Sequence, residues 1–388
     1  MRRLPIALVL VGALAAPGAA SAAGLPPLPR GWPARLDVGV ADSPGGAAAL
    51  RRRAPFGFRY QYLAGGANTG DGWATWNPDG SFVSLYVRES VAAGIVPVFP
   101  YYMLLQSNPA GGDEAAADLR HLRSPAVMRA WWSDFELLLR RAAAFAGRRV
   151  VVHVEPDLWG YVEQAARGDR ASTVPAAVAA SGLPELAGLP DDAAGFAQGL
   201  VRLRDRLAPN VVLAYHLSVW GTRHDVGLED PPNRQVDSLG TQAARFYRSL
   251  GARFDLALTD VADRDAGFRQ RVLRDGGQSW WNPADFARNV RFLARFVRGA
   301  GVRVALWQVP LGNTRLPDTW GRYRDNRVQW LLGPGGRAHL RAYANAGLVA
   351  VLFGGGADGT TSPRTDGGYF HARARAYYRA GPLTLPRR

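Results

Sequence analysis

The sequence contains no cysteine and no lysine. Without cysteine, neither disulfide bonds nor thiolate metal sites can hold the fold together, so burial of apolar side chains has to supply the stability. Without lysine, all 47 basic residues are arginine, and they carry the net charge of +15. Arginines scattered through a chain rich in Ala, Gly and Pro indicate GC-rich codon choice and a solvated basic surface. We therefore expect no nucleic acid partner, with an anionic ligand as the alternative.

Long uncharged apolar runs are also missing after the N-terminus. Residues 1–22 combine two arginines, the apolar stretch Leu4–Ala16 and a small-residue cleavage site, a pattern typical of a secretory signal peptide. No second run of this kind follows, so we expect a secreted, extracellular protein without an integral membrane segment. The predicted division is a signal peptide (1–22), a Pro-rich leader (23–34) and a single domain (35–388).

Two cofactor signatures are absent as well. No Gly-rich phosphate fingerprint follows the first predicted strand, which argues against a dinucleotide-binding fold. The histidines show neither an HExxH motif nor another paired spacing, which argues against a catalytic zinc site. We predict no cofactor and no metal.

Apolar strand-like runs alternate with amphipathic helical segments through the rest of the chain. The clearest helical segments are Ser124–Ala146 and Ala284–Ala300. The strand candidates are Arg35–Val40, Gly57–Tyr62, Ile95–Tyr101, Val150–Glu155, Val211–His216, Phe254–Thr259, Val302–Gln308 and Leu348–Phe353. This alternation predicts an α/β protein, a single parallel (β/α)₈ barrel of the TIM type, with a doubly wound open sheet as the alternative.

The end of the fourth predicted strand is the most informative part of the chain. The buried run Val150–Val154 stops at Glu155, and a proline and Asp157 follow at once. A carboxylate at the end of a buried strand is costly unless it is solvated, paired or used. Catalytic residues of barrels collect at the C-terminal ends of the strands. We therefore expect Glu155 to be functional, with helix capping or pairing with an arginine as the alternative.

Aromatic and polar residues dominate the other strand ends and the loops that follow them. Trp and Tyr rings stack on the apolar faces of sugars, and polar side chains bind the hydroxyl edges, so this mixture is typical of a carbohydrate groove. The predicted substrate-binding residues are Tyr60, Tyr101, Trp159, His216, Trp220, Trp307, Gln308 and Asp358. For each aromatic residue, packing in the core is the alternative.

Glycoside hydrolysis typically uses two carboxyl groups, one to donate a proton and one to attack or to activate water. We predict Glu155 as the acid and Asp260 as the base or nucleophile. Asp157 could be the acid itself, a group that orients Glu155, or a loop cap. Asp260 could instead cap the following turn. His153 shares one side of its strand with Glu155, and we interpret it as a core histidine.

With these residues in view, the chain resembles the barrel glycoside hydrolase superfamily. In the large retaining clan a glutamate acid/base ends the fourth strand and precedes proline, and Val154-Glu155-Pro156 is similar to that element, without the usual preceding Asn. The same clan carries its nucleophile at the end of the seventh strand, where this chain has Gln308, which cannot be that nucleophile. The run Val154–Leu158 also resembles the Glu-Pro-Asp-Ser element of glycoside hydrolase family 6, the inverting cellulases, and Tyr215–Gly221 is similar to a later element.

The sequence therefore predicts a secreted, monomeric glycoside hydrolase that acts on a polysaccharide or oligosaccharide. Because the seventh strand lacks a carboxylate, we favour inverting geometry, with carboxyl groups about 6.5 to 9.5 Å apart. One alternative is a non-catalytic carbohydrate-binding barrel that has lost its second carboxylate. Another is a hydrolase or lyase for a different extracellular substrate, with calcium at Asp260 and Asp263.

Overall fold

The computed structural model describes residues 24–387, so the predicted signal peptide lies outside the described residues. Eight parallel strands form a closed barrel in which each strand pairs with the next and β8 pairs with β1. The strands are β1 (Asp37–Ala41), β2 (Phe58–Tyr60), β3 (Val96–Tyr101), β4 (Val150–Val154), β5 (Val211–His216), β6 (Leu256–Asp260), β7 (Val304–Val309) and β8 (Leu348–Phe353). The predicted barrel is thus confirmed, and the open-sheet alternative is wrong.

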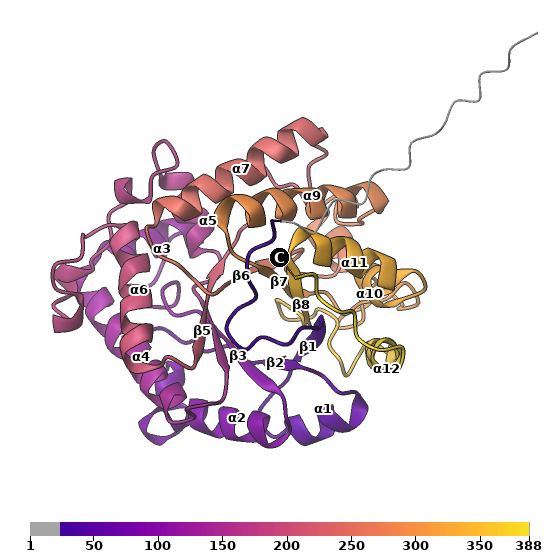
Figure 1. Cartoon of the computed structure of the whole chain (residues 1–388), viewed down its shortest axis with the longest axis horizontal. Coiled ribbons are helices and arrows are strands. Elements are labelled where there is room, and N and C mark those ends of the chain that lie inside the picture. Colours follow the sequence, from indigo (N-terminus) through magenta and orange to yellow (C-terminus); the bar gives the residue numbers. More distant parts are fainter. Residues whose placement is uncertain (1–23, 388) are drawn as a thin grey trace, which may run out of the picture.

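Helices surround the barrel, as the view along it shows (Figure 1). They are α1 (Ala47–Arg53), α2 (Ser81–Ala92), α3 (Glu114–Arg123), α4 (Pro125–Ala143), α5 (Leu158–Ala165), α6 (Ala193–Leu207), α7 (Asn233–Ser249), α8 (Ala266–Phe268), α9 (Pro283–Ala300), α10 (Arg327–Leu332), α11 (Gly336–Ala346) and α12 (Tyr369–Arg379). Short 3₁₀ turns and one π-helical turn occupy some of the connections. Within residues 24–387, no helix combines the length and apolarity needed to cross a bilayer.

The two clearest predicted helices begin at cap residues. The side chain of Ser124 accepts a hydrogen bond from the N–H of Val127 and starts α4. Asn282 and Asp285 form a capping box at the start of α9. Each helix has proline at its first position, where no backbone N–H is needed. Apolar spacing located both helices in the sequence, and these caps fix where each helix begins.

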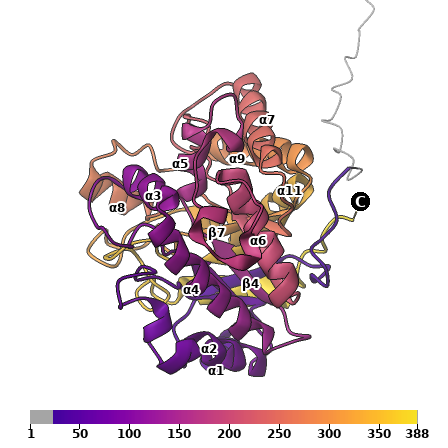
Figure 2. The same ribbon diagram turned by 90° about the vertical axis from the view of Figure 1, so that its left-hand side faces the viewer.

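The Pro-rich leader and the C-terminal segment pack together at the N-terminal end of the barrel. Trp32 stacks on Phe58 of β2 with ring centroids 4.9 Å apart. The buried Arg303 donates hydrogen bonds to the carbonyl oxygens of Pro26 and Pro386. Figure 1 shows the leader crossing the barrel, and Figure 2 shows the C-terminus on the side opposite α3 and α8. A functional site is therefore expected at the C-terminal ends of the strands, on the opposite face of the barrel.

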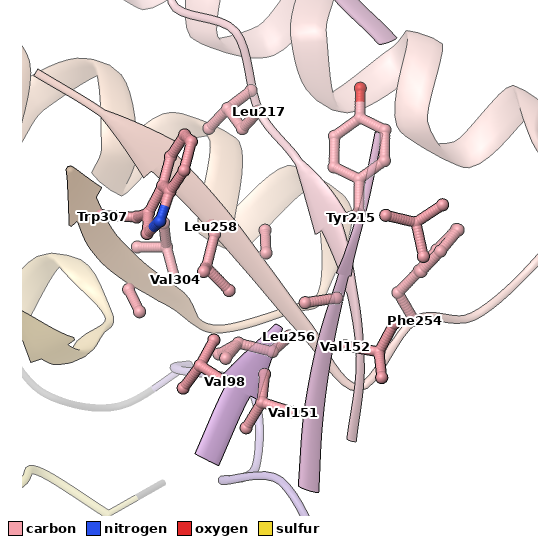
Figure 3. Packing of buried hydrophobic residues seen from close by; sticks show 14 of the residues in the cluster. Val98, Val151, Val152, Tyr215, Leu217, Phe254, Leu256, Leu258, Val304 and Trp307 are labelled. Carbon is pink, nitrogen blue, oxygen red and sulfur yellow. The ribbon is translucent and has the colours of Figure 1, made fainter. Parts of the chain in front are cut away.

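Side chains of the strands alternate between the barrel interior and the layer beneath the helices. One buried cluster contains both sets of side chains: Val151, Leu256 and Trp307 lie on one side of the strand ribbons, and Tyr215 and Phe254 lie on the other (Figure 3). Trp307 therefore lies at the upper end of the interior packing, where β7 ends.

Candidate active site

The carboxylate of Glu155 is buried and fully hydrogen-bonded. It accepts hydrogen bonds from the backbone N–H groups of Met103 and Leu104, at 3.1 Å each to Oε1. The indole N–H of Trp131, on α4, donates to the same oxygen at 2.6 Å. Burial raises the pKa of Glu155 to about 8, although these three donors act to lower it. Glu155 therefore ties the segment after β3 to helix α4.

The backbone conformation at Glu155 explains why its side chain reaches α4. Its φ is 43°, in the left-handed region that side chains other than glycine rarely adopt. His153 follows the expected alternation, and its ring lies inside the barrel, 4.8 Å from Trp307. The turn at Glu155 sends its side chain toward α4, outside the barrel. This placement does not support the predicted role of Glu155 as the proton donor.

Asp157 lies at the start of α5 with φ of 73° and no side-chain capping hydrogen bond. Its side chain is half-buried. Burial raises its pKa to about 8, and the charges of Asp260 and Glu114 act in the same direction. A partly accessible carboxyl group that keeps its proton at neutral pH has the properties of a general acid.

Asp260 ends β6, and its side chain is 17% exposed. Burial raises its pKa to about 6, helped by the charge of Asp225, while Arg269 and Arg327 act to lower it. At neutral pH Asp260 is thus mostly ionised. The charge of Asp260 contributes to the raised pKa of Asp157, and the pKa values of the two carboxyl groups differ, at about 6 and about 8.

Among the described residues, three of the eight positive φ angles at residues other than glycine occur at strand ends near this pair. Positive φ angles occur at Glu155 and Asp157 after β4 and at Gln308 in β7, where φ is 55°. Such conformations cost about 1–3 kcal/mol each and persist where the surroundings impose them, often at functional sites. These conformations redirect side chains at the ends of β4 and β7, and β7 pairs with β6, which carries Asp260.

Aromatic rings form one wall beside the two carboxyl groups. Tyr62 lies 5.8 Å from Trp307 and 6.5 Å from Tyr102, centroid to centroid. The amide of Gln308 donates to the Tyr62 hydroxyl at 3.1 Å. Burial raises the pKa of Tyr62, and the charges of Asp157 and Asp260 act in the same direction. Tyr62, Tyr102 and Trp307 together are called the aromatic wall below.

Three other predicted binding residues lie at or near the C-terminal ends of the strands. Tyr60 is buried beneath the aromatic wall, 6.2 Å from Trp307, and Trp220 lies 4.9 Å from Tyr161 in the loop after β5. Asp358 is exposed in the loop after β8.

Two of the predicted binding residues lie on the outer side of the barrel. The hydroxyl of Tyr101 donates to Asp134 on α4, and the indole of Trp159 donates to the carbonyl of Val154. Neither ring is exposed. Their placement does not support contact with a substrate.

Sequence reasoning missed three residues of the site as binding groups. Tyr62 and Tyr102 form part of the aromatic wall, and Glu114 on α3 accepts a hydrogen bond from the Tyr102 hydroxyl at 2.7 Å. Tyr62 sits two residues beyond Tyr60, so the alternation of side chains could have indicated it. Glu114 lies in a helix after a long loop, and no spacing in the sequence points to it.

Calcium at Asp260 and Asp263 finds no support in the geometry. Asp263 forms ion pairs with Arg264 and Arg269. Within the part of the chain that the structure describes, no group of three or more His, Cys, Asp and Glu side chains could hold a metal ion.

Comparison with known proteins gives matches in structure only, since no protein family and no curated protein matches the chain. A double mutant of the endo-β-1,4-mannanase of Cellulomonas fimi aligns with a TM-score of 0.53 and 12% identity, over 90% of this chain and 72% of that one. A modular endo-β-1,4-mannanase of glycoside hydrolase family 26 from the same organism aligns with a TM-score of 0.53 and 11% identity, over 89% and 70%. This chain has the fold of barrel glycoside hydrolases. The resemblance stated from the sequence is confirmed at the level of the fold.

Proposed function

We propose that this protein is a secreted glycoside hydrolase that cleaves a polysaccharide or oligosaccharide. Asp157 donates the proton and Asp260 serves as the base or nucleophile. The observation that carries the proposal is the placement of Asp157 after β4 and of Asp260 at the end of β6, beside the aromatic wall, with the pKa of Asp157 raised to about 8 and that of Asp260 to about 6. Environments that separate the pKa values of two neighbouring carboxyl groups assign one as acid and the other as base.

The aromatic wall supports a carbohydrate substrate. Tyr62 and Tyr102 are partly exposed next to the carboxyl pair, with the buried Trp307 packed behind Tyr62, and sugar rings stack on such ring surfaces through their apolar faces. The two structures compared above are mannanases, which fits the same substrate class without identifying the sugar.

Bond cleavage then follows from the protonation states. The carboxylic acid of Asp157 gives its proton to the glycosidic oxygen as the bond to the anomeric carbon breaks. The carboxylate of Asp260 attacks that carbon, or removes a proton from the water that attacks it. Gln308 at the end of β7 cannot take this part, and it donates to Tyr62 instead. The second carboxyl group therefore comes from β6.

The proposal predicts a bell-shaped pH dependence of kcat/KM. Activity falls below about pH 6 as Asp260 becomes protonated, and above about pH 8 as Asp157 loses its proton. The measurement is hydrolysis of a soluble oligosaccharide at constant ionic strength from about pH 4 to about pH 10. Asp260→Asn should remove the acidic limb from any residual activity. A profile without an alkaline limb would contradict the role of Asp157.

A non-catalytic carbohydrate-binding barrel is the second candidate, favoured by Gln308, which stands at a strand end where the resembling clan has its nucleophile. Release of reducing ends from plant, fungal and bacterial polysaccharides separates the two. Turnover supports the hydrolase. Binding by calorimetry without turnover on any substrate of the panel selects the binding barrel.

A further inference from the structure

We infer that His153 and His216 act as a neutral, hydrogen-bonded pair that positions Asp260, with the Nε2–H of His216 directed at Asp260 Oδ1. The inference rests on the proposed function only because that function gives Asp260 a part in the reaction. His216 is a positioning residue, and His153 acts through it.

The two rings lie in direct contact inside the barrel. Nε2 of His153 is 3.0 Å from Nδ1 of His216, and the ring planes stack at 27°. Neither side chain is exposed. Trp307 packs edge-on against both rings, at 80° and 86°. One of the two facing nitrogens has to donate and the other to accept, so the contact couples the tautomers of the two rings.

The second nitrogen of His216 faces the reactive carboxyl group. Nε2 of His216 lies 3.7 Å from Oδ1 of Asp260. Both atoms are buried, and neither has a hydrogen-bond partner among the described residues. The separation exceeds hydrogen-bond length, but such contacts are often long in the free enzyme and shorten in the complex with substrate. A small movement of the carboxylate would satisfy both atoms at once.

Burial and charge fix which tautomer is present. Burial lowers the pKa of His216 to about 3, and that of His153 well below its usual value, so both rings are neutral at the pH where Asp260 is ionised. An ionised Asp260 needs a donor, which places the proton of His216 on Nε2. Nδ1 of His216 then accepts from the Nε2–H of His153.

The ring nitrogen of His153 that does not face His216 supports this choice of tautomer. Its Nδ1 is buried and has no hydrogen-bond partner. In the proposed tautomer this atom carries no proton and is only an unused acceptor. In the opposite tautomer it would be a buried N–H without an acceptor, which folded proteins rarely contain.

The pair acts on Asp260 together with charged groups from neighbouring elements. The raised pKa of Asp260 reflects its burial and the charge of Asp225, and Arg269 and Arg327 oppose them. Asp157 and Tyr62 face Asp260 from the segments after β4 and β2. An N–H from His216 stabilises the ionised form of Asp260 without adding a positive charge.

The tautomers of the two histidines can be determined by ¹⁵N NMR of protein labelled at histidine, which requires no catalytic activity. The variants His153→Gln and His216→Gln assign the signals. We expect both rings to stay neutral between about pH 5 and pH 8 and to carry their proton on Nε2 above about pH 6, where Asp260 is ionised. A proton on Nδ1 of His216, or a ring that becomes charged in this range, would overturn the inference. Because this result does not depend on activity, it stands apart from the test of the proposed hydrolase.

Two substitutions at His216 test its effect on Asp260. His216→Gln can place an amide N–H where Nε2 lies, whereas His216→Leu cannot donate. We expect His216→Leu to move the acidic limb of kcat/KM upward by about one pH unit and to lower kcat about tenfold, and His216→Gln to restore most of both. The position of the limb does not depend on the folded fraction, which urea denaturation reports separately. An acidic limb of kcat/KM at the same pH in the parent and both variants would refute the positioning role of His216. Absence of turnover in the parent would refute the hydrolase and leave the NMR result intact.

Discussion

Asp157→Asn is expected to lower kcat/KM by roughly a hundredfold to ten thousandfold on natural substrates, the range associated with loss of general acid catalysis. The amide cannot deliver a proton to the glycosidic oxygen, while it keeps nearly the same size. Substrates with a good leaving group, such as nitrophenyl glycosides, need little protonation and should lose far less. The measurement is initial rates on both substrate types at neutral pH.

Asp205→Asn on α6 provides the matched control. This aspartate is 63% exposed and pairs with Arg204, on a helix outside the proposed site. Its substitution should leave turnover unchanged. An equal loss for both substrate types in Asp157→Asn would argue that Asp157 supports binding or folding and does not donate the proton.

Glu155→Ala is expected to destabilise the fold by about 3 to 5 kcal/mol, because three buried N–H groups lose their acceptor. The donors belong to Met103, Leu104 and Trp131, so the segment after β3 should also loosen against α4. The measurement is the shift of the urea midpoint, followed by tryptophan fluorescence. Unchanged stability would show that these contacts contribute little.

Glu155→Gln distinguishes this structural role from catalysis. The variant keeps one carbonyl acceptor and nearly the same volume, so we expect a smaller loss of stability and turnover within about tenfold of the parent. A folded Glu155→Gln protein with turnover reduced several hundredfold would restore Glu155 to the acid role that the sequence suggested.

The barrel could be predicted from sequence because strands of parallel sheets are buried on both faces. Such strands appear as continuous apolar runs, and β4, β5 and β8 are of this kind. The helices between them have apolar periodicity and recognisable caps, as at Ser124 and Asn282. Both signals are local, so a single sequence suffices to order the elements.

The directions of site side chains could be predicted only in part. Asp157 and Asp260 were recognised as carboxylates at strand ends, but the side of the strand on which Glu155 lies depends on its positive φ, which no residue pattern encodes. Tyr101 and Tyr102 differ by one position and therefore point to opposite sides of the sheet. Tyr101 contacts Asp134 beneath α4, whereas Tyr102 joins the aromatic wall.

The most direct test of the account is a crystal structure of the Asp157→Asn protein with a bound oligosaccharide that it cleaves slowly. We predict a glycosidic oxygen within about 2.6–3.2 Å of the side chain at position 157, an anomeric carbon or its attacking water facing Asp260, and a sugar ring against the aromatic wall. A sugar bound elsewhere on the barrel, or one whose glycosidic oxygen lies next to Glu155 and away from position 157, would contradict it.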